Sequence, residues 1–426
     1  MRTRIYLPLA ILLVVSVIVV VVSWPEKEDE PQTWSKKGAW YKGNTHTHSL
    51  WSDGNDFPDM IVDWYKERGY HFLALSDHNI LSRGEKWMKV NDVEKRRKVG
   101  KTGTLDKYLE RFGEEWVELR GAEGEREVRL KTLEEIRPRF EEEGRFLLVE
   151  AEEITDRFKQ FQVHINAINL GEVIEPQHGD SVVETMRNNL KAVKEQSERL
   201  GRPIMTHLNH PNFHWSVTPQ QLAEVVEEQF FEVYNGHPGI NHLGDDEHPG
   251  DEAIWDIANT LRILVHNAPP LYGVATDDSH YYHGGNVSPG RGWVMVWSEE
   301  LEADSLVVAM QRGEFYASSG VELKSIDYDR EQPKIELEVI GAKGVTYETK
   351  FIGTRMKTPE KTGEVFATVT GTRAEYQLEG DELYVRAVVN SSRDHPNPSY
   401  KDQCEQAWTQ PVGWERHLDG PGQTTR

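Results

Sequence analysis

The fold is decided by two similar stretches, residues 40–48, WYKGNTHTH, and residues 72–78, FLALSDH. In each, a short apolar run is followed directly by polar residues. Five more runs of the same kind follow, ending at Glu153, Asn166, His207, Asn235 and Asp278. Helical patterns alternate with these runs as far as about residue 297, and such alternation is typical of parallel strands joined by crossover helices. The sequence therefore predicts a seven-stranded α/β barrel.

Histidines and carboxylates gather at the predicted strand ends. In a parallel barrel the loops after the strands form one face, so groups far apart in sequence converge there. His46 and His48 have i, i+2 spacing, which on extended backbone points both imidazoles to the same side. Asp53 follows in an SDG turn, and His78 ends the next strand. Six of the seven strand ends carry a group able to bind a metal, which predicts a metal centre on that face.

Three carboxylates, Glu150, Glu152 and Glu153, crowd the third strand in LLVEAEEIT. Carboxylates this close raise one another's pKa unless cations neutralise them. Because alternate residues of a strand face opposite sides, Glu152 points away from Glu153, into solvent or toward a helix. We therefore predict Glu153 as the ligand and keep Glu152 as a weaker candidate.

The later strands supply more candidate ligands, which are His164, His207, His210, Asp277, Asp278 and His280. Taken alone, a histidine such as His164 would more often be a hydrogen-bonded core residue than a metal ligand. Cys404 is the single cysteine, so neither an intrachain disulfide nor a cysteine zinc cage is possible, and any metal must be held by His, Asp and Glu. No nucleophile elbow and no phosphate-cradling glycine loop occurs, which disfavours covalent catalysis by a side chain.

The motifs HTHS, SDG, SDHN, EEIT, HPN and DDSH, together with His164, occur in this order between residues 43 and 320. In this order they resemble the PHP (polymerase and histidinol phosphatase) superfamily of metal-dependent hydrolases. The resemblance implies a distorted (β/α)7 TIM-like barrel that holds two or three Zn, Mn or Fe ions. This chain departs from the common pattern in having Ala151 where a Gly often precedes the Glu by two residues.

The resemblance also implies a set of ligands for each ion. One ion would be held by His46, His48, Glu153 and Asp278. Glu153 would bridge to a second ion bound by His164 and His210. A third site would consist of Asp53, His78 and His280. The pairs His207/His210 and Asp277/Asp278 leave the choice within each pair open.

More narrowly, HLNHPNF, FEVYNGHP, GVATDDSH, PGRGWV and GEFYASSGVEL are similar to the carbaryl-hydrolase branch of that superfamily, whose members cleave a carbamate ester. The implied function is hydrolysis of an ester-type bond of a small molecule, either a phosphoester or a carbamate or carboxyl ester. Bound ions would lower the pKa of a shared water and supply hydroxide. His207 or Arg291 could stabilise the developing charge or protonate the leaving group, although Arg291 could instead cap a loop carbonyl.

The chain has 49 Lys and Arg residues against 71 Asp and Glu, a formal net charge of -22. Such a charge repels phosphate backbones and anionic lipid surfaces, which argues against nucleic acid as a partner. No obligate protein partner is indicated. The alternative to an enzyme is a catalytically silent, surface-displayed binding module.

Residues 5–24 form an uncharged stretch of about 20 residues, the length needed to cross a bilayer as a helix. Arg2 and Arg4 precede it and should stay in the cytoplasm. We predict a transmembrane anchor over residues 1–24, with a cleaved signal peptide as the alternative. A charged linker, 25–39, follows. The rest of the chain is therefore expected outside the cytoplasmic membrane, in the periplasm or on the cell surface.

Three further segments complete the predicted organisation. The barrel is expected over residues 40–320, and residues 79–144 form a charged helical insertion, either a solvated excursion or a lid over the site. Residues 321–412 have alternating strand patterns and predict a small β-sandwich. Residues 413–426 are expected to be a frayed tail.

Overall fold

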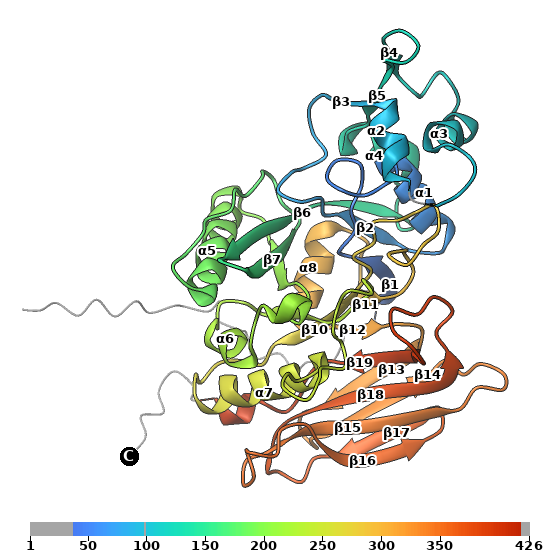
Figure 1. Ribbon diagram of the computed structural model, residues 1–426. Coiled ribbons are helices and arrows are strands. Elements are labelled where there is room, and N and C mark those ends of the chain that lie inside the picture. Colours follow the sequence, from blue (N-terminus) through green and yellow to red (C-terminus); the bar gives the residue numbers. More distant parts are fainter. Residues whose placement is uncertain (1–36, 98, 419–426) are drawn as a thin grey trace, which may run out of the picture. The chain divides into compact units, whose positions relative to one another are not determined.

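The computed structural model of the protein describes residues 37–97 and 99–418 (Figure 1). The predicted membrane or signal segment, 1–24, lies outside the described residues, as do most of the linker and the end of the tail. Within the described ranges, no helix is long and apolar enough to cross a membrane. These residues belong to one compact unit.

Seven strands correspond to the seven apolar runs of the sequence. In the sheet they follow the order β10-β9-β8-β7-β6-β2-β1. Their bounds are β1 (Ala39–Asn44), β2 (Phe72–Leu75), β6 (Leu147–Phe158), β7 (Phe161–Ile168), β8 (Met205–Leu208), β9 (Phe230–Asn235) and β10 (Tyr272–Thr276). Because β6 and β7 are longer than expected, Glu153 and Asn166 lie inside strands rather than at their ends.

The prediction of uniformly parallel strands was wrong for the middle of the sheet. The pairs β1–β2, β2–β6, β8–β9 and β9–β10 are parallel, but β6–β7 and β7–β8 are antiparallel. The physical reason is a two-residue turn between β6 and β7. Lys159, in this turn, has a left-handed backbone conformation (φ 56°), and the chain reverses its direction to form a hairpin. His164 is thereby brought opposite Thr155 without a crossover helix.

The predicted closed barrel is also not seen, because β10 ends the sheet and does not pair with β1. Instead β1 pairs antiparallel with β11 (Trp293–Ser298). A single bridge, Thr47 with Ser279, joins the segments that leave β1 and β10. The sheet is therefore open along β10, and the two segments that carry candidate ligands meet just beyond it.

Helices cover this sheet through apolar stripes. They are α1 (Pro58–Glu67), α5 (Val182–Leu200), α6 (Pro219–Glu224), α7 (Asp251–Leu264) and α8 (Ala303–Gln311). The longest of them, α5, begins where the Ser181 side chain accepts a hydrogen bond from the Glu184 backbone, and it ends at left-handed Gly201. Its buried residues Val182, Met186 and Leu190 join residues of β7, β8 and β9 in one hydrophobic core.

The insertion after β2 is a packed subdomain. It contains β3 (Lys86–Lys89), α2 (Val90–Arg96), α3 (Thr104–Phe112), β4 (Leu119–Arg120), β5 (Glu127–Leu130) and α4 (Leu133–Phe140). The strands form a separate sheet, β3-β5-β4, which the helical prediction missed. Its apolar residues share a core with Leu50, Trp51 and Phe57, so the insertion is built onto the segment that follows the first two histidines.

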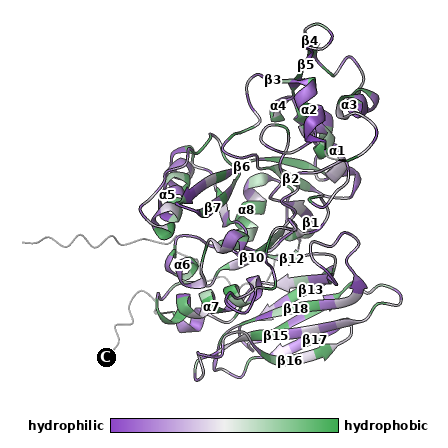
Figure 2. Cartoon of the chain, in the orientation of Figure 1, coloured by the Kyte–Doolittle hydropathy of each residue, from purple (hydrophilic) through white to green (hydrophobic). Residues whose placement is uncertain are grey.

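The C-terminal strands form two layers. Beyond β11 the large sheet continues through β12 (Phe315–Ser318), β19 (Cys404–Thr409), β18 (Glu382–Asp394), β15 (Tyr347–Arg355) and β16 (Glu364–Thr370). A second sheet contains β13 (Leu323–Asp329), β14 (Lys334–Val339) and β17 (Arg373–Gln377). Hydrophobic and hydrophilic residues are interleaved along these strands, and the apolar side chains of both sheets share one core (Figure 2). The predicted boundary at residue 320 stays a prediction.

A buried ion pair ties the C-terminal layers to α7. Arg386 of β18 is 1% exposed, and its Nη2 and Nε atoms donate to the Asp256 carboxylate at 2.7 and 2.9 Å. The Tyr384 hydroxyl donates to the same carboxylate at 2.8 Å. Removing one partner of such a pair leaves an uncompensated charge in the interior.

We therefore expect Arg386→Met to lower the free energy of unfolding by about 3–5 kcal/mol, because Asp256 loses its counter-charge while buried. Arg373→Met is the control, since Arg373 is 78% exposed beside Glu338 and such pairs contribute about 0–1 kcal/mol. Urea denaturation of both variants measures the difference. Equal midpoints would show that the α7 contact does not stabilise the fold.

Candidate metal centre

The first two histidines leave β1 on extended backbone. The His46 backbone N–H donates to Asn44 Oδ1 at 3.0 Å, and Thr47, between the histidines, points away and donates its hydroxyl to the Ala74 carbonyl at 2.7 Å. The His48 backbone N–H donates to the Ser279 carbonyl at 3.0 Å. Both imidazoles therefore face one side, with ring centroids 5.1 Å apart.

Asp278 is the member of its pair that faces these histidines. It has left-handed backbone (φ 46°), and its Oδ1 atom lies 3.4 Å from His46 Nε2 and 3.2 Å from His48 Nε2. Asp277 turns the other way. Its carboxylate accepts from the Tyr65 hydroxyl at 2.6 Å and from the backbone N–H groups of residues 290, 291 and 292. Asp277 is thus a structural residue that holds the loop after β10.

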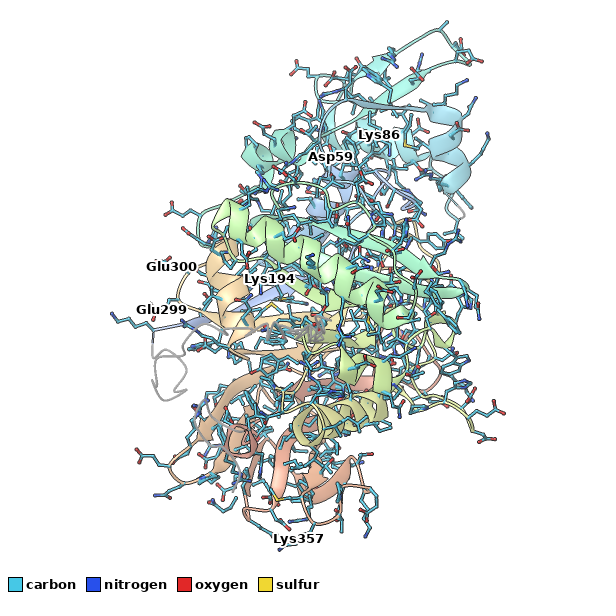
Figure 3. All side chains as sticks on the ribbon, turned by 90° about the vertical axis from the view of Figure 1, so that its left-hand side faces the viewer. Asp59, Lys86, Lys194, Glu299, Glu300 and Lys357 are labelled. Atoms are coloured by element: carbon cyan, nitrogen blue, oxygen red, sulfur yellow. The ribbon has the colours of Figure 1, made fainter. Side chains whose placement is uncertain are left out.

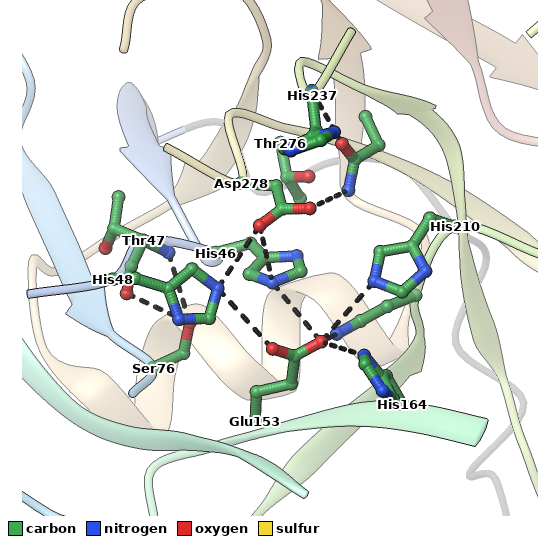
Figure 4. A network of polar contacts seen from close by, with 12 residues as sticks. His46, Thr47, His48, Ser76, Glu153, His164, His210, His237, Thr276 and Asp278 are labelled. Atoms are coloured by element: carbon green, nitrogen blue, oxygen red, sulfur yellow. Dashed lines mark hydrogen bonds and ion pairs between the residues drawn. The ribbon is translucent and has the colours of Figure 1, made fainter. Parts of the chain in front are cut away.

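Glu153 lies at the middle of the cluster, and its two oxygens face different histidines (Figure 4). Near Oε1 are His46 Nε2 at 3.5 Å, His164 Nδ1 at 3.0 Å and His210 Nε2 at 3.5 Å. Near Oε2 are His48 Nε2 at 3.4 Å and His78 Nδ1 at 2.8 Å. A carboxylate placed this way can bridge two ions.

A second group lies further out, around Asp53. Its Oδ1 atom is 3.5 Å from His78 Nε2, 3.4 Å from His280 Nε2 and 3.8 Å from His48 Nδ1. We call these four residues, His48, Asp53, His78 and His280, the outer group. Their ligand atoms all lie within 4.8 Å of one another.

The structure brings together all nine residues predicted as metal ligands. Besides the outer group, three inner sets have the spacing of an ion site: His46, His48 and Glu153; His46, His210 and Asp278; and Glu153, His164 and His210. The sets implied by the resemblance are divided differently. The first of them is split, because Asp278 groups with His46 and His210 and not with His48 and Glu153, and His48 also groups with Asp53.

The cluster has the chemistry of a metal site. Two of its buried atoms, His46 Nε2 and His48 Nε2, have no hydrogen-bond partner among the described residues, and Glu153 Oε2 has only the ion-pair contact with His78 Nδ1. Buried polar atoms without partners are costly, yet here they converge on one another. Imidazole nitrogens and carboxylate oxygens suit Zn, Mn or Fe ions, so the residues present fit a set of divalent cations.

The charges of the cluster depend on one another. Burial alone would raise the pKa of Glu153, but His78, His164 and His46 together hold it well below its ordinary value. Burial would lower the pKa of His46, but Asp278, Glu232 and Glu153 raise it well above its ordinary value. The buried carboxylates therefore stay ionised only because positive charge surrounds them.

Glu232, on β9, is a functional residue that the sequence analysis missed. Its Oε1 atom is 2.7 Å from His46 Nδ1, and its Oε2 accepts from the His210 backbone N–H at 2.7 Å. Burial opposes its ionisation, yet His46, His207 and His210 lower its pKa to about 2. A carboxylate on Nδ1 orients the ring and leaves Nε2 for a metal. The signal that could have found it is a glutamate inside the apolar run FFEVYN.

His207 does not fit the catalytic role predicted for it. Its ring is fully buried, with Nε2 3.1 Å from the Thr45 hydroxyl and Nδ1 4.0 Å from Glu232 Oε1. It packs beside His46, with ring centroids 6.3 Å apart, and joins none of the four ion-site groups. His210, two residues beyond the end of β8, has positive φ (27°) and is the member of the pair that joins the ion-site groups.

Arg291 likewise does not point a free guanidinium at the site. Its Nη1 atom donates to the carbonyls of Gly236 (2.7 Å) and Asn286, and its Nε and Nη2 donate to the Asn397 carbonyl and side chain at 3.1 Å. The structure thus favours the capping alternative, in which Arg291 fixes the loops around β10.

His237 was not predicted, but it lies beside the outer group. Its ring centroid is 5.8 Å from that of His280. The Gly239 backbone N–H donates to His237 Nδ1 at 3.0 Å, so the neutral ring carries its proton on Nε2. Burial lowers the pKa of His237, which keeps the ring neutral near pH 7. Figure 4 shows its position next to Asp278.

No family model matches the chain, and no curated protein matches it. One similar solved structure is a two-domain protein from Bacteroides vulgatus containing a predicted PHP-like metal-dependent phosphoesterase. It is 14% identical, with a TM-score of 0.39 over 88% of this chain and 96% of that chain. A proposed metal-dependent phosphoesterase from Bifidobacterium adolescentis is 12% identical, with a TM-score of 0.31 over 57% of this chain and 89% of that chain. An amidohydrolase from Chromobacterium violaceum, with bound sulfate and no metal, is 14% identical, with a TM-score of 0.28 over 56% of this chain and 87% of that chain.

We expect His46→Ala and Asp278→Ala each to reduce bound metal and to abolish metal-dependent hydrolysis, because each removes a group from the inner sets. The matched control is His71→Ala, since His71 lies before β2, away from the cluster, and its imidazole Nδ1 accepts the Lys42 backbone N–H at 3.0 Å. Plasma mass spectrometry gives the metal content. Full metal content in the Asp278 variant would contradict the inner sets.

A second pair of variants separates Glu153 from its neighbour. Glu153→Gln should lose at least one metal equivalent, because both its oxygens face histidines of the cluster. Glu152→Gln should keep its metals. Glu152 is buried on the opposite side of β6, where it accepts from the Ile174 backbone N–H at 2.8 Å, and burial raises its pKa to about 8. Glutamine therefore resembles the neutral, protonated side chain that Glu152 already has at pH 7. Metal loss in the Glu152 variant would overturn this assignment.

Proposed function

We propose that this protein is a metal-dependent hydrolase that cleaves an ester-type bond of a small molecule. The observation that carries the proposal is the convergence of nine imidazole and carboxylate ligands, among which the buried His46 Nε2 and His48 Nε2 atoms have no hydrogen-bond partner within the described residues. Structural metal sites are usually closed by four ligands, whereas a cluster of several adjoining groups with a solvent-facing side suits catalysis. The outer group supplies that side, because Asp53 is 57% exposed.

Bound divalent ions would supply a water of lowered pKa and a Lewis acid for the scissile group. The residues of the chain prepare the site for that chemistry. Glu232 fixes the ring of His46, and Asn235 donates its amide to Asp278 Oδ2 at 3.2 Å, which orients that carboxylate. His237 presents an Nε2–H group near the outer group. It can donate to a developing oxyanion or to the leaving group.

The surrounding side chains narrow the substrate class only in part. Four of the aromatic residues near the strand ends serve the fold: Trp51, Phe57, Tyr282 and Trp293 are buried in the core or hydrogen-bonded to backbone. Phe213, Trp215 and Tyr281 are partly exposed, and Phe213 lies 5.2 Å from His210 between ring centroids. These three could form an apolar wall for an aryl ester.

Arg157 favours an anionic substrate. It lies on the same face of β6 as Glu153, four residues further along, and it pairs with Gln162, whose side chain contacts His164 at 3.3 Å. Arg157 is exposed and forms no ion pair within the described residues, whereas Arg83 is engaged by Glu150. Arginine is the residue most suited to bind two oxygens of a phosphate group. Phosphoesters are therefore candidate substrates together with carbamates and carboxyl esters.

The test is to assay the purified, metal-loaded protein on p-nitrophenyl phosphates, phosphodiesters, carboxyl esters and aryl carbamates. We expect hydrolysis of at least one class, lost on chelation and restored by Zn or Mn. Glu153→Gln protein purified in parallel controls for contaminating activity. If phosphoesters are the substrate, Arg157→Gln should raise KM about 10-fold or more by removing a charge-assisted hydrogen bond. Full metal content without turnover of any class would favour the binding-module alternative.

A further inference from the structure

Asp53 is the most exposed of the nine ligands. Its side chain is 57% exposed, against 26% for His78 and 15% for His280, and the six others are at most 9% exposed. It also lies in a turn rather than on a strand. Holding an exposed side chain and its backbone in one geometry costs conformational entropy, so a ligand placed this way needs support from the protein around it.

The inner side of the Asp53 turn is held by the core. Ser52 donates its backbone N–H and its hydroxyl to Asp77 Oδ1 at 3.0 and 2.6 Å. On the other side of Asp53, a Cβ atom at Gly54 would lie 2.4 Å from the His48 carbonyl oxygen, so the turn presses against the histidine segment. These contacts fix one edge of the turn.

The outer side is held by the insertion. Arg96, the last residue of α2, donates Nη1 to the Ser52 carbonyl at 2.6 Å and to the Gly54 carbonyl at 3.1 Å. These carbonyls belong to the residues immediately before and after Asp53. Lys86 of β3 donates its Nζ to the Trp51 carbonyl, and the Trp51 indole N–H donates to the Lys131 carbonyl at 3.0 Å. Figure 3 shows Lys86 in this part of the molecule.

The insertion also contacts the segment that carries His280. Three residues further along, the His283 ring is enclosed by α3, with Nδ1 3.0 Å from Lys107 Nζ and Nε2 3.3 Å from the Thr104 hydroxyl. His283 Nε2 also lies 3.1 Å from the Asn55 carbonyl, two residues after Asp53. One subdomain thus supports both chain segments that bring Asp53 and His280 together.

We propose that the insertion is a clamp that sets the metal affinity of the outer group, with Arg96 as its positioning residue. The inference rests on the proposed function only in that the outer group binds a metal. Arg96 contacts no ligand side chain. It acts by holding the carbonyls of Ser52 and Gly54, the residues before and after Asp53, so its loss frees the Asp53 turn while Glu153, which lies within β6, stays in place.

The comparison of Arg96→Met with Arg97→Met tests this proposal. Arg97 is the matched control, because its Nη1 bonds, to the carbonyls of Gly100 (2.8 Å) and Thr102 (2.6 Å), stay within the insertion. Both variants and the unaltered full chain are titrated with Zn or Mn, and bound metal is counted by plasma mass spectrometry. We expect Arg96→Met to lose one equivalent that returns only at about 10–100-fold higher free metal, the range found when a supporting contact to a ligand is removed. Arg97→Met should bind like the unaltered chain, and Arg96→Lys should recover part of the affinity.

Two results would overturn the clamp. One is full occupancy of Arg96→Met at the free metal concentration that fills the unaltered chain. The other is equal metal loss in the Arg96 and Arg97 variants, which would mean that the insertion contributes only general stability. Failure of the proposed function gives a different result, since the unaltered protein would then bind no metal or, with metal bound, hydrolyse no substrate.

Discussion

The site depends on one buried charge, the carboxylate of Glu153. It lies in the middle of a strand, away from solvent, and its two oxygens face five histidines in two directions. An ionised carboxylate in such a place is tolerable only with positive charge on both sides. The nitrogens of the surrounding imidazoles lie where they could hold cations beside this carboxylate. Glu232 orients the ring of His46, and the Asn209 side chain donates to Glu153 Oε1.

The open sheet explains how these groups can converge without a closed barrel. Beyond the last paired residues of β1 and β10, Thr47 and Ser279 form a single bridge, and Asp278 donates its backbone N–H to the His46 carbonyl at 2.9 Å. On the other side, His78, beyond the end of β2, forms a similar bridge with Glu153 in the middle of β6. The backbone that carries these ligands is therefore hydrogen-bonded to neighbouring segments. These hydrogen bonds limit the movement of the ligands in the same way as pairing between strands.

The parts added to this sheet have different relations to the site. The C-terminal layers are joined to it by strand pairing through β12 and β19, by the buried Arg386–Asp256 pair, and by Asn397, which accepts from Arg291 in the loop after β10. The insertion instead contacts the two segments that carry the outer group. Its charged sequence predicts solvated helices or a lid, but its core is continuous with Trp51 and Phe57, and its polar residues reach the Asp53 turn.

Strand ends and ligand candidates could be read from the sequence, because a strand's alternation and the polar residues after it are local properties. His46, His48, Asp53, His78, Glu153 and His280 were predicted in that way, whereas His164 was predicted as a ligand only from the family resemblance. The choice within His207/His210 and Asp277/Asp278 depended on backbone turned to positive φ at His210 and Asp278, which a residue type alone does not determine. The antiparallel β6–β7 hairpin, the missing closure at β10, and the partners Glu232 and Arg96 were decided only by the tertiary structure. Each of these rests on hydrogen bonds between segments far apart in the chain, whose pairing is set by the packing of the whole fold.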